Sequence, residues 1–288
     1  MNDITIHDAI LQGYKHLTKK HPNYQNETLW IMKKVLNEDT SYIFLNKFYS
    51  LNSNQYQLFI NLIKRRKTKE PLQHILNSVS FYGYNFEIRK NVFIPRPETE
   101  LLIDIIKKNI GFKSNVLEIG TGSGCIPIVI ELEKLANNIQ SIDINHDALS
   151  LARSNAKKFN CNQINFSYRN LFTLKVDQKY DLIVSNPPYI SLDEISNLDY
   201  EVTLYDPLNA LTDYDNGLIF YKYFADFGIK NLSEKGYMLF EFGGQNQVND
   251  LKTIFNNKNY SYTFFNDFNN KPRFILIKKL LLFILLPY

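Results

Sequence analysis

The sequence is poor in the residues that hold metals and disulfides. Only two cysteines occur, Cys125 and Cys161, which excludes a disulfide framework and is typical of a reducing compartment. The five histidines show no paired spacing, so we expect no metal site. The first residues form neither a basic region nor an apolar stretch of the kind found in signal peptides. We therefore expect a cytoplasmic protein.

Long apolar runs are also lacking. The run over residues 280–286 falls far short of the ~20 apolar residues that a spanning helix needs. Packing of this tail against the core, or a loose tail, is favoured over a membrane anchor. We expect no membrane association, and the role of residues 280–288 stays open.

Net charge is small. A formal charge of +4 does not by itself indicate nucleic acid binding, and we expect no direct nucleic acid partner and a monomer. The most basic run covers residues 64–69, for which a solvated helix end is favoured over a docking patch for an acidic partner. A hydrophobic content of 44% with 22% charged residues is that of a globular, core-forming protein.

The hydrophobic pattern changes along the chain. Apolar residues in 1–72 recur mostly every three or four positions, which predicts a helical domain. Aromatic residues alternate around Gly83, which predicts a β-hairpin linker over 73–95. From 96 to 288, apolar strands alternate with helices, which predicts a parallel sheet covered on both faces. We expect strands at 115–119, 139–144, 164–168, 180–185 and 237–242, a final antiparallel pair at 260–265 and 273–278, and helices at 98–110, 126–135, 147–159, 217–232 and 245–255.

The most informative motif is the Asn-Pro-Pro-Tyr tetrapeptide at residues 186–189, directly after an apolar strand. Two prolines cannot continue a central strand, because neither has an N–H group for the ladder. The tetrapeptide therefore lies at the carboxyl end of the strand, where α/β sheets bind ligands. Asn186 at this place can hold a planar NH2 group while Tyr189 covers its flat face. The alternative, a double proline that merely ends the strand, explains less.

A second motif is the glycine loop Gly-Thr-Gly-Ser-Gly at residues 120–124, between a predicted strand and a predicted helix. Glycines allow a ligand to approach the backbone closely, and a helix N-terminus favours anions. The spacing differs from the Gly-x-Gly-x-x-Gly of dinucleotide folds, which disfavours a dehydrogenase. Asp143 ends the next predicted strand, where an acidic side chain can bind both hydroxyls of a ribose.

Together these motifs resemble the S-adenosylmethionine-dependent methyltransferases with a seven-stranded, Rossmann-like sheet. The resemblance implies an α/β fold and S-adenosylmethionine as the cofactor. It implies that Asn170 and Leu171 contact the adenine, although the family usually has an acidic residue at the position of Asn170. The cofactor-binding residues so implied are Gly120, Thr121, Gly122, Ser123, Gly124, Asp143, Asn170, Leu171 and Asn186.

Further motifs narrow the resemblance to the protein-(glutamine-N5) methyltransferases that modify peptide chain release factors. The segment 92–100 (Val-Phe-Ile-Pro-Arg-Pro-Glu-Thr-Glu) closely resembles their interdomain motif. Asn77 replaces a usual glycine, Asp206 replaces a usual glutamate, and the tail after Lys279 is extra. The other matching segments are 70–75, 80–83, 206–211 and 240–245.

The resemblance implies that the chain methylates the glutamine of the Gly-Gly-Gln motif of release factors. The implied domains are a helical substrate-recognition domain over 1–72, a β-hairpin linker over 73–95 and a methyltransferase domain over 96–288. Arg96 and Glu98 either line the substrate cleft or form a salt-bridged helix start, and both interpretations stay open. The predicted catalytic residues are Asn186, Pro187 and Tyr189, and the predicted substrate contacts are these with Pro188, Arg96 and Glu98.

Two other functions are considered. One is a nucleic acid methyltransferase acting on adenine N6 or guanine N2, which the modest charge and the lack of a broad basic stripe disfavour. The other is a non-catalytic cofactor-binding or RNA-docking protein. The intact glycine loop, Asp143 and Asn186 argue against it, whereas Asn170 leaves it some support.

Overall fold

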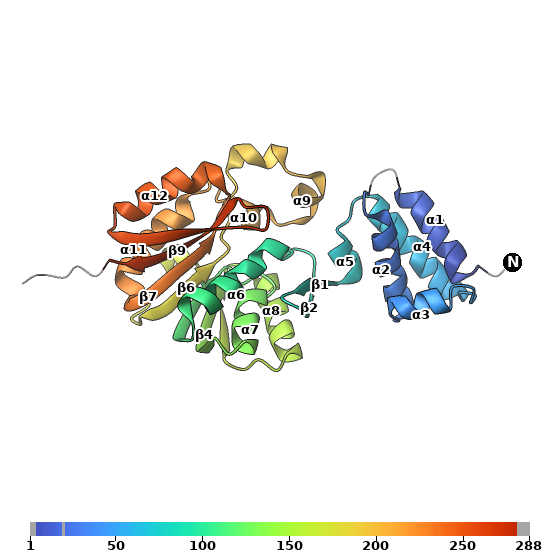
Figure 1. Ribbon diagram of the computed structural model, residues 1–288, viewed down its shortest axis with the longest axis horizontal. Helices are drawn as coiled ribbons and strands as arrows, with labels where there is room; N and C mark the ends of the chain where they lie inside the picture. The colour runs from blue at the N-terminus through green and yellow to red at the C-terminus, as the bar shows by residue number, and fades with distance from the viewer. Residues whose placement is uncertain (1–3, 19–20, 281–288) are drawn as a thin grey trace, which may run out of the picture. The chain divides into compact units, whose positions relative to one another are not determined.

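The computed structural model describes residues 4–18 and 21–280 (Figure 1), and the chain divides into two compact units. One unit comprises the chain up to Val79 together with Tyr200–Tyr205, and the other comprises Ser80–Asp199 and the chain from Asp206 onward. The prediction for the apolar tail covers residues 280–288. Of these, residues 281–288 lie outside the described range. Of the described helices, none is both long enough and apolar enough to cross a membrane.

Polar side chains start the helices of the first unit. Thr5 Oγ1 accepts a hydrogen bond from Asp8 N at 3.1 Å, and Asp8 accepts one from Thr5 N at 3.3 Å. Asn52 and Gln55 form the same kind of capping box at a later helix. The apolar residues at helical spacing form one core, as predicted. The helices are α1 (Ile6–Leu17), α2 (Tyr24–Leu36), α3 (Thr40–Leu45), α4 (Ser53–Lys67) and α5 (Leu72–Leu76).

Arg66 is a buried charge near the end of α4. Its guanidinium donates to both carboxylate oxygens of Glu27 at 2.8 Å and to Glu201 Oε1 at 2.8 Å. Glu201 lies in the short helix α9 (Tyr200–Tyr205), which belongs to the first unit although it follows the tetrapeptide in sequence. The solvated-end prediction for residues 64–69 is therefore wrong for Arg66, because a buried charge needs such partners. The lysines of the run are exposed, as predicted.

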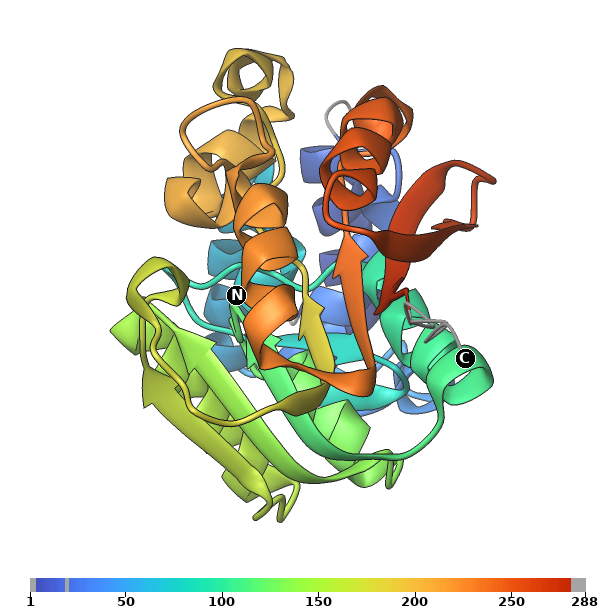
Figure 2. The same ribbon diagram turned by 90° about the vertical axis from the view of Figure 1, so that its left-hand side faces the viewer.

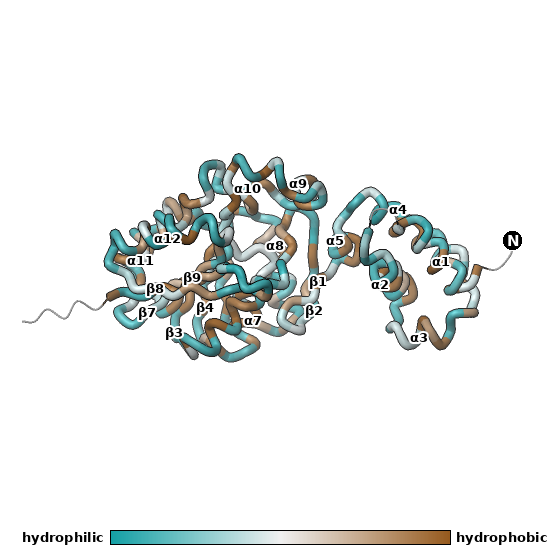
Figure 3. Tube along the Cα trace, turned by 45° about the horizontal axis from the view of Figure 1, so that its top comes forward, coloured by the Kyte–Doolittle hydropathy of each residue, from teal (hydrophilic) through white to brown (hydrophobic). Residues whose placement is uncertain are grey.

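Apolar side chains of α3 and of the turn after it are exposed. Phe44 is 58% exposed, Leu45 85% and Phe48 70%. Helix α3 is coloured as hydrophobic in Figure 3. Lys47 Nζ lies 4.9 Å from the centroid of the Phe48 ring. The first unit therefore presents an apolar surface that is separate from its own core.

A β-hairpin follows the helices, as predicted. Its strands are β1 (Ser78–Phe81) and β2 (Tyr84–Glu87). Tyr82 and Gly83 form the turn with φ of 51° and 79°, as in the mirror-image turns that suit two-residue hairpins. Asn77, just before β1, has φ of 56°. This left-handed conformation explains why a glycine is usual there and why asparagine can replace it.

Seven strands of the described chain form one sheet in the order β5-β4-β3-β6-β7-β9-β8 (Figures 1 and 2). Strands β3 to β7 pair in parallel, whereas β9 pairs antiparallel with both β7 and β8. This arrangement confirms the predicted Rossmann-like sheet with an antiparallel pair at its edge. The strands are β3 (Lys113–Ile119), β4 (Ala136–Asp143), β5 (Ile164–Tyr168), β6 (Tyr180–Ser185), β7 (Leu232–Glu241), β8 (Tyr260–Asn266) and β9 (Pro272–Lys279).

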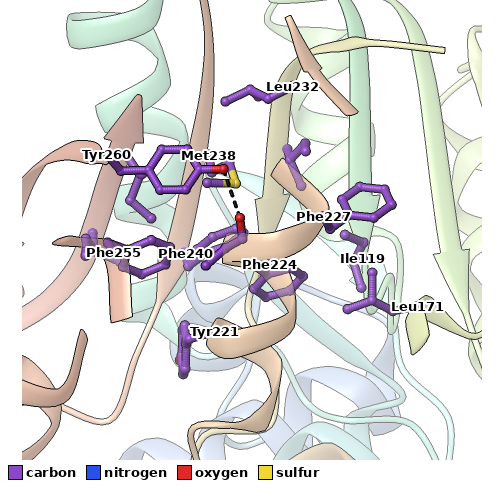
Figure 4. Packing of buried hydrophobic residues seen from close by; sticks show 14 of the residues in the cluster. Ile119, Leu171, Tyr221, Phe224, Phe227, Leu232, Met238, Phe240, Phe255 and Tyr260 are labelled. Carbon is purple, nitrogen blue, oxygen red and sulfur yellow. Dashed lines mark hydrogen bonds between the residues drawn. The ribbon is translucent and has the colours of Figure 1, made fainter. Parts of the chain in front are cut away.

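Helices cover both faces of this sheet. Helices α7 and α8 pack on one face, and α11 and α12 pack on the other (Figure 2). The core under α11 is aromatic (Figure 4): the rings of Phe224 and Phe240 stack with centroids 4.2 Å apart, and Tyr260 Oη donates to Ala225 O at 2.9 Å. The helices of this unit are η1 (Pro97–Glu100), α6 (Leu101–Ile105), η2 (Ile106–Ile110), α7 (Cys125–Leu132), α8 (His146–Lys158), η3 (Leu171–Thr173), η4 (Leu192–Asn197), α10 (Leu208–Leu211), α11 (Ile219–Asn231), η5 (Gln245–Gln247) and α12 (Val248–Asn256).

Candidate functional site

The glycine loop of residues 120–124 joins the end of β3 to the start of α7. Its three glycines have φ of +80°, +53° and +80°, which side chains with a Cβ rarely adopt. Gly120 N donates to Ile142 O at 2.8 Å, and Gly124 N donates to Thr121 O at 2.8 Å. The loop is therefore held by its own backbone and by the end of β4.

The three glycines of this loop meet different surroundings. A Cβ on Gly124 would lie 3.0 Å from Ala152 Cβ, so this glycine lets the loop pack against α8. The nearest atom to a Cβ on Gly120 would be Asn186 O, at 4.0 Å. A Cβ on Gly122 would have no heavy atom within 4 Å and would enter open space above the loop. Gly122 is thus the glycine that leaves room for a ligand.

Two buried hydroxyl groups of the loop interact with neighbouring side chains. The Thr121 hydroxyl opposes the rise in the pKa of the Glu118 carboxyl, and the Ser123 hydroxyl opposes the rise in the pKa of the Cys125 thiol. The glycine backbone and the open space at Gly122 fit a polar, nucleoside-bearing cofactor such as S-adenosylmethionine.

Asp143, at the end of β4, holds the loop from the side. Its Oδ2 accepts a hydrogen bond from Gly122 N at 3.0 Å, and its Oδ1 accepts one from Asn145 N at 2.8 Å. Burial raises the pKa of Asp143, and hydrogen bonds from the backbone N–H groups of Gly122, Asn145 and Ile144 oppose the rise. A carboxylate can accept about four hydrogen bonds, so Asp143 can still accept one from a ribose hydroxyl. The predicted contact to the ribose stays a prediction, and holding the loop is a task that the sequence did not reveal.

Asn170 and Leu171 follow β5 at the same edge of the sheet. Asn170 is exposed, and its Oδ1 accepts a hydrogen bond from Phe172 N at 2.9 Å, which caps η3. Leu171 is only 3% exposed and packs in the core under α11. Their predicted contacts to adenine stay predictions, and the bond to Phe172 N already engages the amide oxygen of Asn170.

Glu118 is an acid that the motif-based prediction missed. It lies in β3 between Leu117 and Ile119 and is fully buried, and its Oε2 accepts a hydrogen bond from Ser141 Oγ. Burial raises the pKa of Glu118 to about 8. An acid inside an otherwise apolar strand just before a glycine loop was the available signal, because such a residue is rarely buried without a purpose.

The acceptor segment, residues 186–189, begins where β6 ends. Ser185 Oγ donates to Ile119 O at 2.7 Å, which ties this strand end to β3 beside the glycine loop. Asn186 is half-buried, and its Nδ2 donates to Thr99 Oγ1 at 3.2 Å. Pro187 is buried and Pro188 is half-buried. The structure therefore brings Asn186 next to the glycine loop, as the sequence predicts.

Glu241 is a second buried acid, at the carboxyl end of β7. Its Oε2 accepts a hydrogen bond from Thr99 Oγ1 at 2.7 Å, and its Oε1 accepts one from Tyr189 Oη at 3.1 Å. Burial raises the pKa of Glu241 to about 7, while the two donated hydrogen bonds oppose the rise. Glu241 and Thr99 both lie in segments that resemble the family, but the sequence indicates no role for either residue.

The backbone after the prolines is also fixed. Tyr189 O accepts a hydrogen bond from Gln247 Nε2 at 2.9 Å, and Gln247 Oε1 accepts one from Gly243 N at 2.8 Å. A Cβ on Gly217 would lie 2.2 Å from Tyr189 O, so only glycine fits beside this carbonyl. The Tyr189 hydroxyl is held by Glu241, and burial raises its pKa. The predicted packing of this ring over a substrate amide stays a prediction.

Arg96 and Glu98 lie in the segment before α6. The Arg96 guanidinium pairs with the buried carboxylate of Asp206 and lies 5.0 Å from the centroid of the Phe93 ring. Of the two interpretations left open for Arg96, the structure thus contains the ion pair. Glu98 is half-buried, and its charge raises the pKa of Glu241. Their contacts to a substrate stay predictions.

The structure gathers the predicted residues along one edge of one sheet. The glycine loop and Asp143 follow β3 and β4, and Asn186 follows β6, which pairs with β3. Among the described residues, no group of three or more His, Cys, Asp or Glu side chains has the geometry of a metal site. This edge can bind a nucleoside-bearing cofactor next to a group that accepts hydrogen bonds.

Comparison with known proteins agrees with this architecture. Residues 95–202 match the family model for the methyltransferase small domain, and residues 8–76 match that for the PrmC N-terminal domain. A methyltransferase from Pyrococcus furiosus aligns over 70% of this chain and 92% of its own length, with a TM-score of 0.53 and 17% sequence identity. The chain therefore contains a methyltransferase domain with a Rossmann-like fold.

The curated relatives define the family more narrowly. A release factor glutamine methyltransferase of Clostridium botulinum is 32% identical over 84% of this chain and 88% of its own length. The protein of the same name from Fusobacterium nucleatum is 41% identical over 76% of this chain. The alignment spans only 62% of the length of the Fusobacterium protein. The chain belongs to the family of release factor glutamine methyltransferases.

Proposed function

We propose that this chain transfers a methyl group from S-adenosylmethionine to the side-chain amide nitrogen, N5, of the glutamine in the Gly-Gly-Gln motif of peptide chain release factors. The observation that carries this proposal is the placement of Asn186. Its side-chain amide is held by Thr99 at the end of β6, and its backbone carbonyl is the atom nearest to a Cβ built on Gly120. Asn186, which we propose to bind the substrate amide, thus lies next to the glycine loop.

The nucleophile in this reaction is weak, because the amide lone pair is delocalised into the carbonyl group. Asn186 Oδ1 and the Pro187 carbonyl can accept the two amide hydrogens and hold the nitrogen in line with the methyl group. When bound, S-adenosylmethionine supplies an electrophilic methyl group, so that forming the N–C bond is matched by cleavage of the S–C bond and release of one amide proton to water. Well-oriented reactions of this kind gain about 7–11 kcal/mol from positioning.

The cofactor is assigned to the loop side of the edge. A Cβ on Gly122 would enter open space, and we propose that this space holds the cofactor and that Asp143 binds its ribose. Asn170 and Leu171 are proposed to flank the adenine. In this assignment the residues bind and orient the reactants and exclude water, and no side chain needs to act as a strong base.

The first unit is proposed to bind the body of the release factor. Its exposed apolar surface includes Phe44, Leu45 and Phe48, which are not needed for its core. The family model that matches residues 8–76 supports a separate domain in this part of the chain. We propose that this domain spans 1–72, that the linker spans 73–95 and that the catalytic domain spans 96–288. We also propose that the enzyme acts as a monomer in the cytoplasm.

A labelling experiment tests this function. The chain is incubated with S-adenosylmethionine carrying a labelled methyl group and one of three substrates: a release factor, its Gly-Gly-Ala loop variant, or duplex DNA. Label is expected on the unmodified factor only, at the loop glutamine. Equal labelling of the loop variant would overturn the proposal. Preferential labelling of DNA would also overturn it and would favour a nucleic acid methyltransferase.

A further inference from the structure

Three side chains form a continuous hydrogen-bond relay at the acceptor end of the site. Asn186 Nδ2 and Thr99 Oγ1 are 3.2 Å apart, and Thr99 Oγ1 and Glu241 Oε2 are 2.7 Å apart. Thr99 and Glu241 are each only 2% exposed, so water has little access to either partner. We call Glu241, Thr99 and Asn186 the acceptor relay.

The Glu241 carboxylate determines the direction of each hydrogen bond in the acceptor relay. An ionised carboxylate only accepts hydrogen bonds, and a threonine hydroxyl has a single hydrogen to donate. When Glu241 is ionised, the Thr99 hydrogen is therefore committed to Oε2. Thr99 Oγ1 can then only accept from Asn186, and only the Nδ2 end of the Asn186 amide can face it. The Oδ1 end of Asn186 must face away from Thr99.

This direction matters because an asparagine amide has two ends of similar shape and opposite polarity. With Oδ1 turned outward, Asn186 presents an acceptor, which suits the NH2 group of a glutamine. With Nδ2 turned outward it would present a donor, which would repel that NH2 group and attract a carboxylate. Shape alone does not distinguish the two orientations, so a polar partner has to do so.

The same carboxylate also holds the other end of the acceptor segment. Glu241 Oε1 accepts the hydrogen bond of Tyr189 Oη at 3.1 Å. Glu241 Oε2 is thus linked to Asn186 through Thr99, whereas Glu241 Oε1 is bound directly by Tyr189. Glu241 therefore couples the direction of the Asn186 amide to the position of the Tyr189 ring.

We propose that Thr99 and Glu241 are positioning residues that fix the Asn186 amide with its oxygen toward the substrate, and so make the site select an amide over a carboxylate. This inference rests on the proposed function for the identity of the substrate. The orientation of Asn186 itself is a property of the free protein and can be measured without a substrate.

Protonation of Glu241 removes this constraint on the direction of the Asn186 amide. A protonated carboxyl can donate to Thr99, which frees the Thr99 hydrogen for Asn186 Oδ1. The groups that face Glu241 are Thr99 and Glu98 of η1, Tyr189, Arg273 of β9, and Tyr221 of α11, whose hydroxyl donates to Glu241 O at 2.7 Å. Since its pKa is raised to about 7, turnover is expected to fall as the pH drops through this range. Glu241→Gln should abolish this part of the pH profile.

The test compares Thr99→Val, which keeps the shape but removes the hydroxyl, with Thr99→Ser, which keeps the hydroxyl. Loss of an oriented hydrogen bond predicts a roughly tenfold lower kcat for Thr99→Val and near-normal kcat for Thr99→Ser. The dissociation constant of S-adenosylmethionine should be unchanged in both. The matched control is Thr28→Val. Thr28 is a buried threonine of α2, and its hydroxyl donates to Tyr24 O at 2.7 Å.

A second readout uses no substrate. The two side-chain NH2 signals of Asn186 are followed by NMR in the ¹⁵N-labelled protein and assigned by their loss in Asn186→Asp. One of the two protons is expected to shift in Thr99→Val and to stay in place in Thr99→Ser and Thr28→Val. Unchanged Asn186 signals, or full kcat in Thr99→Val, would overturn the inference.

The two proposals fail in different ways. If the wild type does not label release factors but the Asn186 signals depend on the Thr99 hydroxyl, the positioning role stands and the substrate assignment falls. If the wild type labels the factor while Thr99→Val keeps full kcat, the function stands and the positioning role falls.

Discussion

The proposed cofactor side and the proposed acceptor side of the same sheet edge are held in different ways. On the cofactor side, the loop of residues 120–124 is fixed by backbone groups: glycines with positive φ, bonds to Ile142 O and the carboxylate of Asp143, which accepts from Gly122 N. On the acceptor side, Asn186 is fixed by the side chains of Thr99 and Glu241. The glycine loop therefore depends on backbone conformation, whereas the position of Asn186 depends on which side-chain atoms donate and which accept hydrogen bonds.

This difference determines how each side can be broken. A backbone-built loop is sensitive to one added Cβ atom, because its conformation and its clearance both require glycine. The acceptor relay is sensitive to changes that keep volume and alter polarity, such as threonine to valine. Three predictions test this contrast, from the largest expected effect to the smallest.

The largest effect is expected at Asn186. Asn186→Ala should lower turnover by roughly 10²–10³-fold, because the substrate amide loses a preorganised acceptor. Affinity for S-adenosylmethionine should fall far less than turnover, because the glycine loop and Asp143, which supply most of the predicted cofactor contacts, are untouched. Steady-state kinetics and calorimetry measure the two quantities, and Asn249→Ala on the exposed side of α12 is the control. Near-normal turnover would contradict the amide contact.

A smaller effect is expected from alanine at two loop glycines. The left-handed conformation costs about 1–2 kcal/mol for a non-glycine residue at either site. Gly124→Ala adds a contact of 3.0 Å to Ala152, and overpacking of this kind costs about 1–3 kcal/mol more. Gly122→Ala should be the more stable variant but should bind the cofactor about tenfold more weakly, because its methyl group enters the open space. Thermal unfolding and titration calorimetry separate the two. Unchanged cofactor affinity in Gly122→Ala would contradict the assignment of that space.

The smallest effect concerns the pH dependence of stability. Burial raises the pKa of Glu241 to about 7 and that of Glu118 to about 8, above the value of 4.5 for an exposed glutamate. The folded state thus binds protons that the unfolded chain has released, so this stabilisation is complete below pH 4.5 and is lost as pH rises through 7 and then 8. Relative to the wild type, the melting temperature of Glu241→Gln should rise from pH 5 to about 7 and then level off, and that of Glu118→Gln should rise up to about pH 8. A constant difference across this range would contradict the raised pKa values.

Much of the fold could be predicted because buried parallel strands are nearly continuous apolar runs. Strand 180–185 was predicted with its observed bounds. Strand β7 (Leu232–Glu241) was predicted to begin at 237, because residues 233–235 are polar and residue 236 is glycine, which hides its first half. The helix predicted over 98–110 begins with a 3₁₀ turn and ends with a π turn around α6. These hydrogen-bond variants leave the apolar spacing almost unchanged, so the sequence does not reveal them.

The two sides of the site also differ in how far the sequence reveals them. The glycine loop and the tetrapeptide are local, so their residues adjoin in sequence and can be recognised as motifs. The acceptor relay joins Thr99 to Asn186 across 87 positions and to Glu241 across 142. No local pattern marks such a contact. The pairing of β6 with β7 brings Asn186 and Glu241 together, and Thr99 reaches them from η1, which continues into α6 beside β7. A buried acid at a strand end was the only signal.

Helix α9 has a topological consequence. The chain passes between the two units after Val79, again after Asp199 and a third time after Tyr205. No single cut can therefore separate the units, and removing the first 79 residues would leave Glu201 without Arg66, its partner in an ion pair. Limited proteolysis between residues 79 and 80 should yield a nicked but associated protein. A chain shortened in this way would keep α9 while lacking the helices of its own unit.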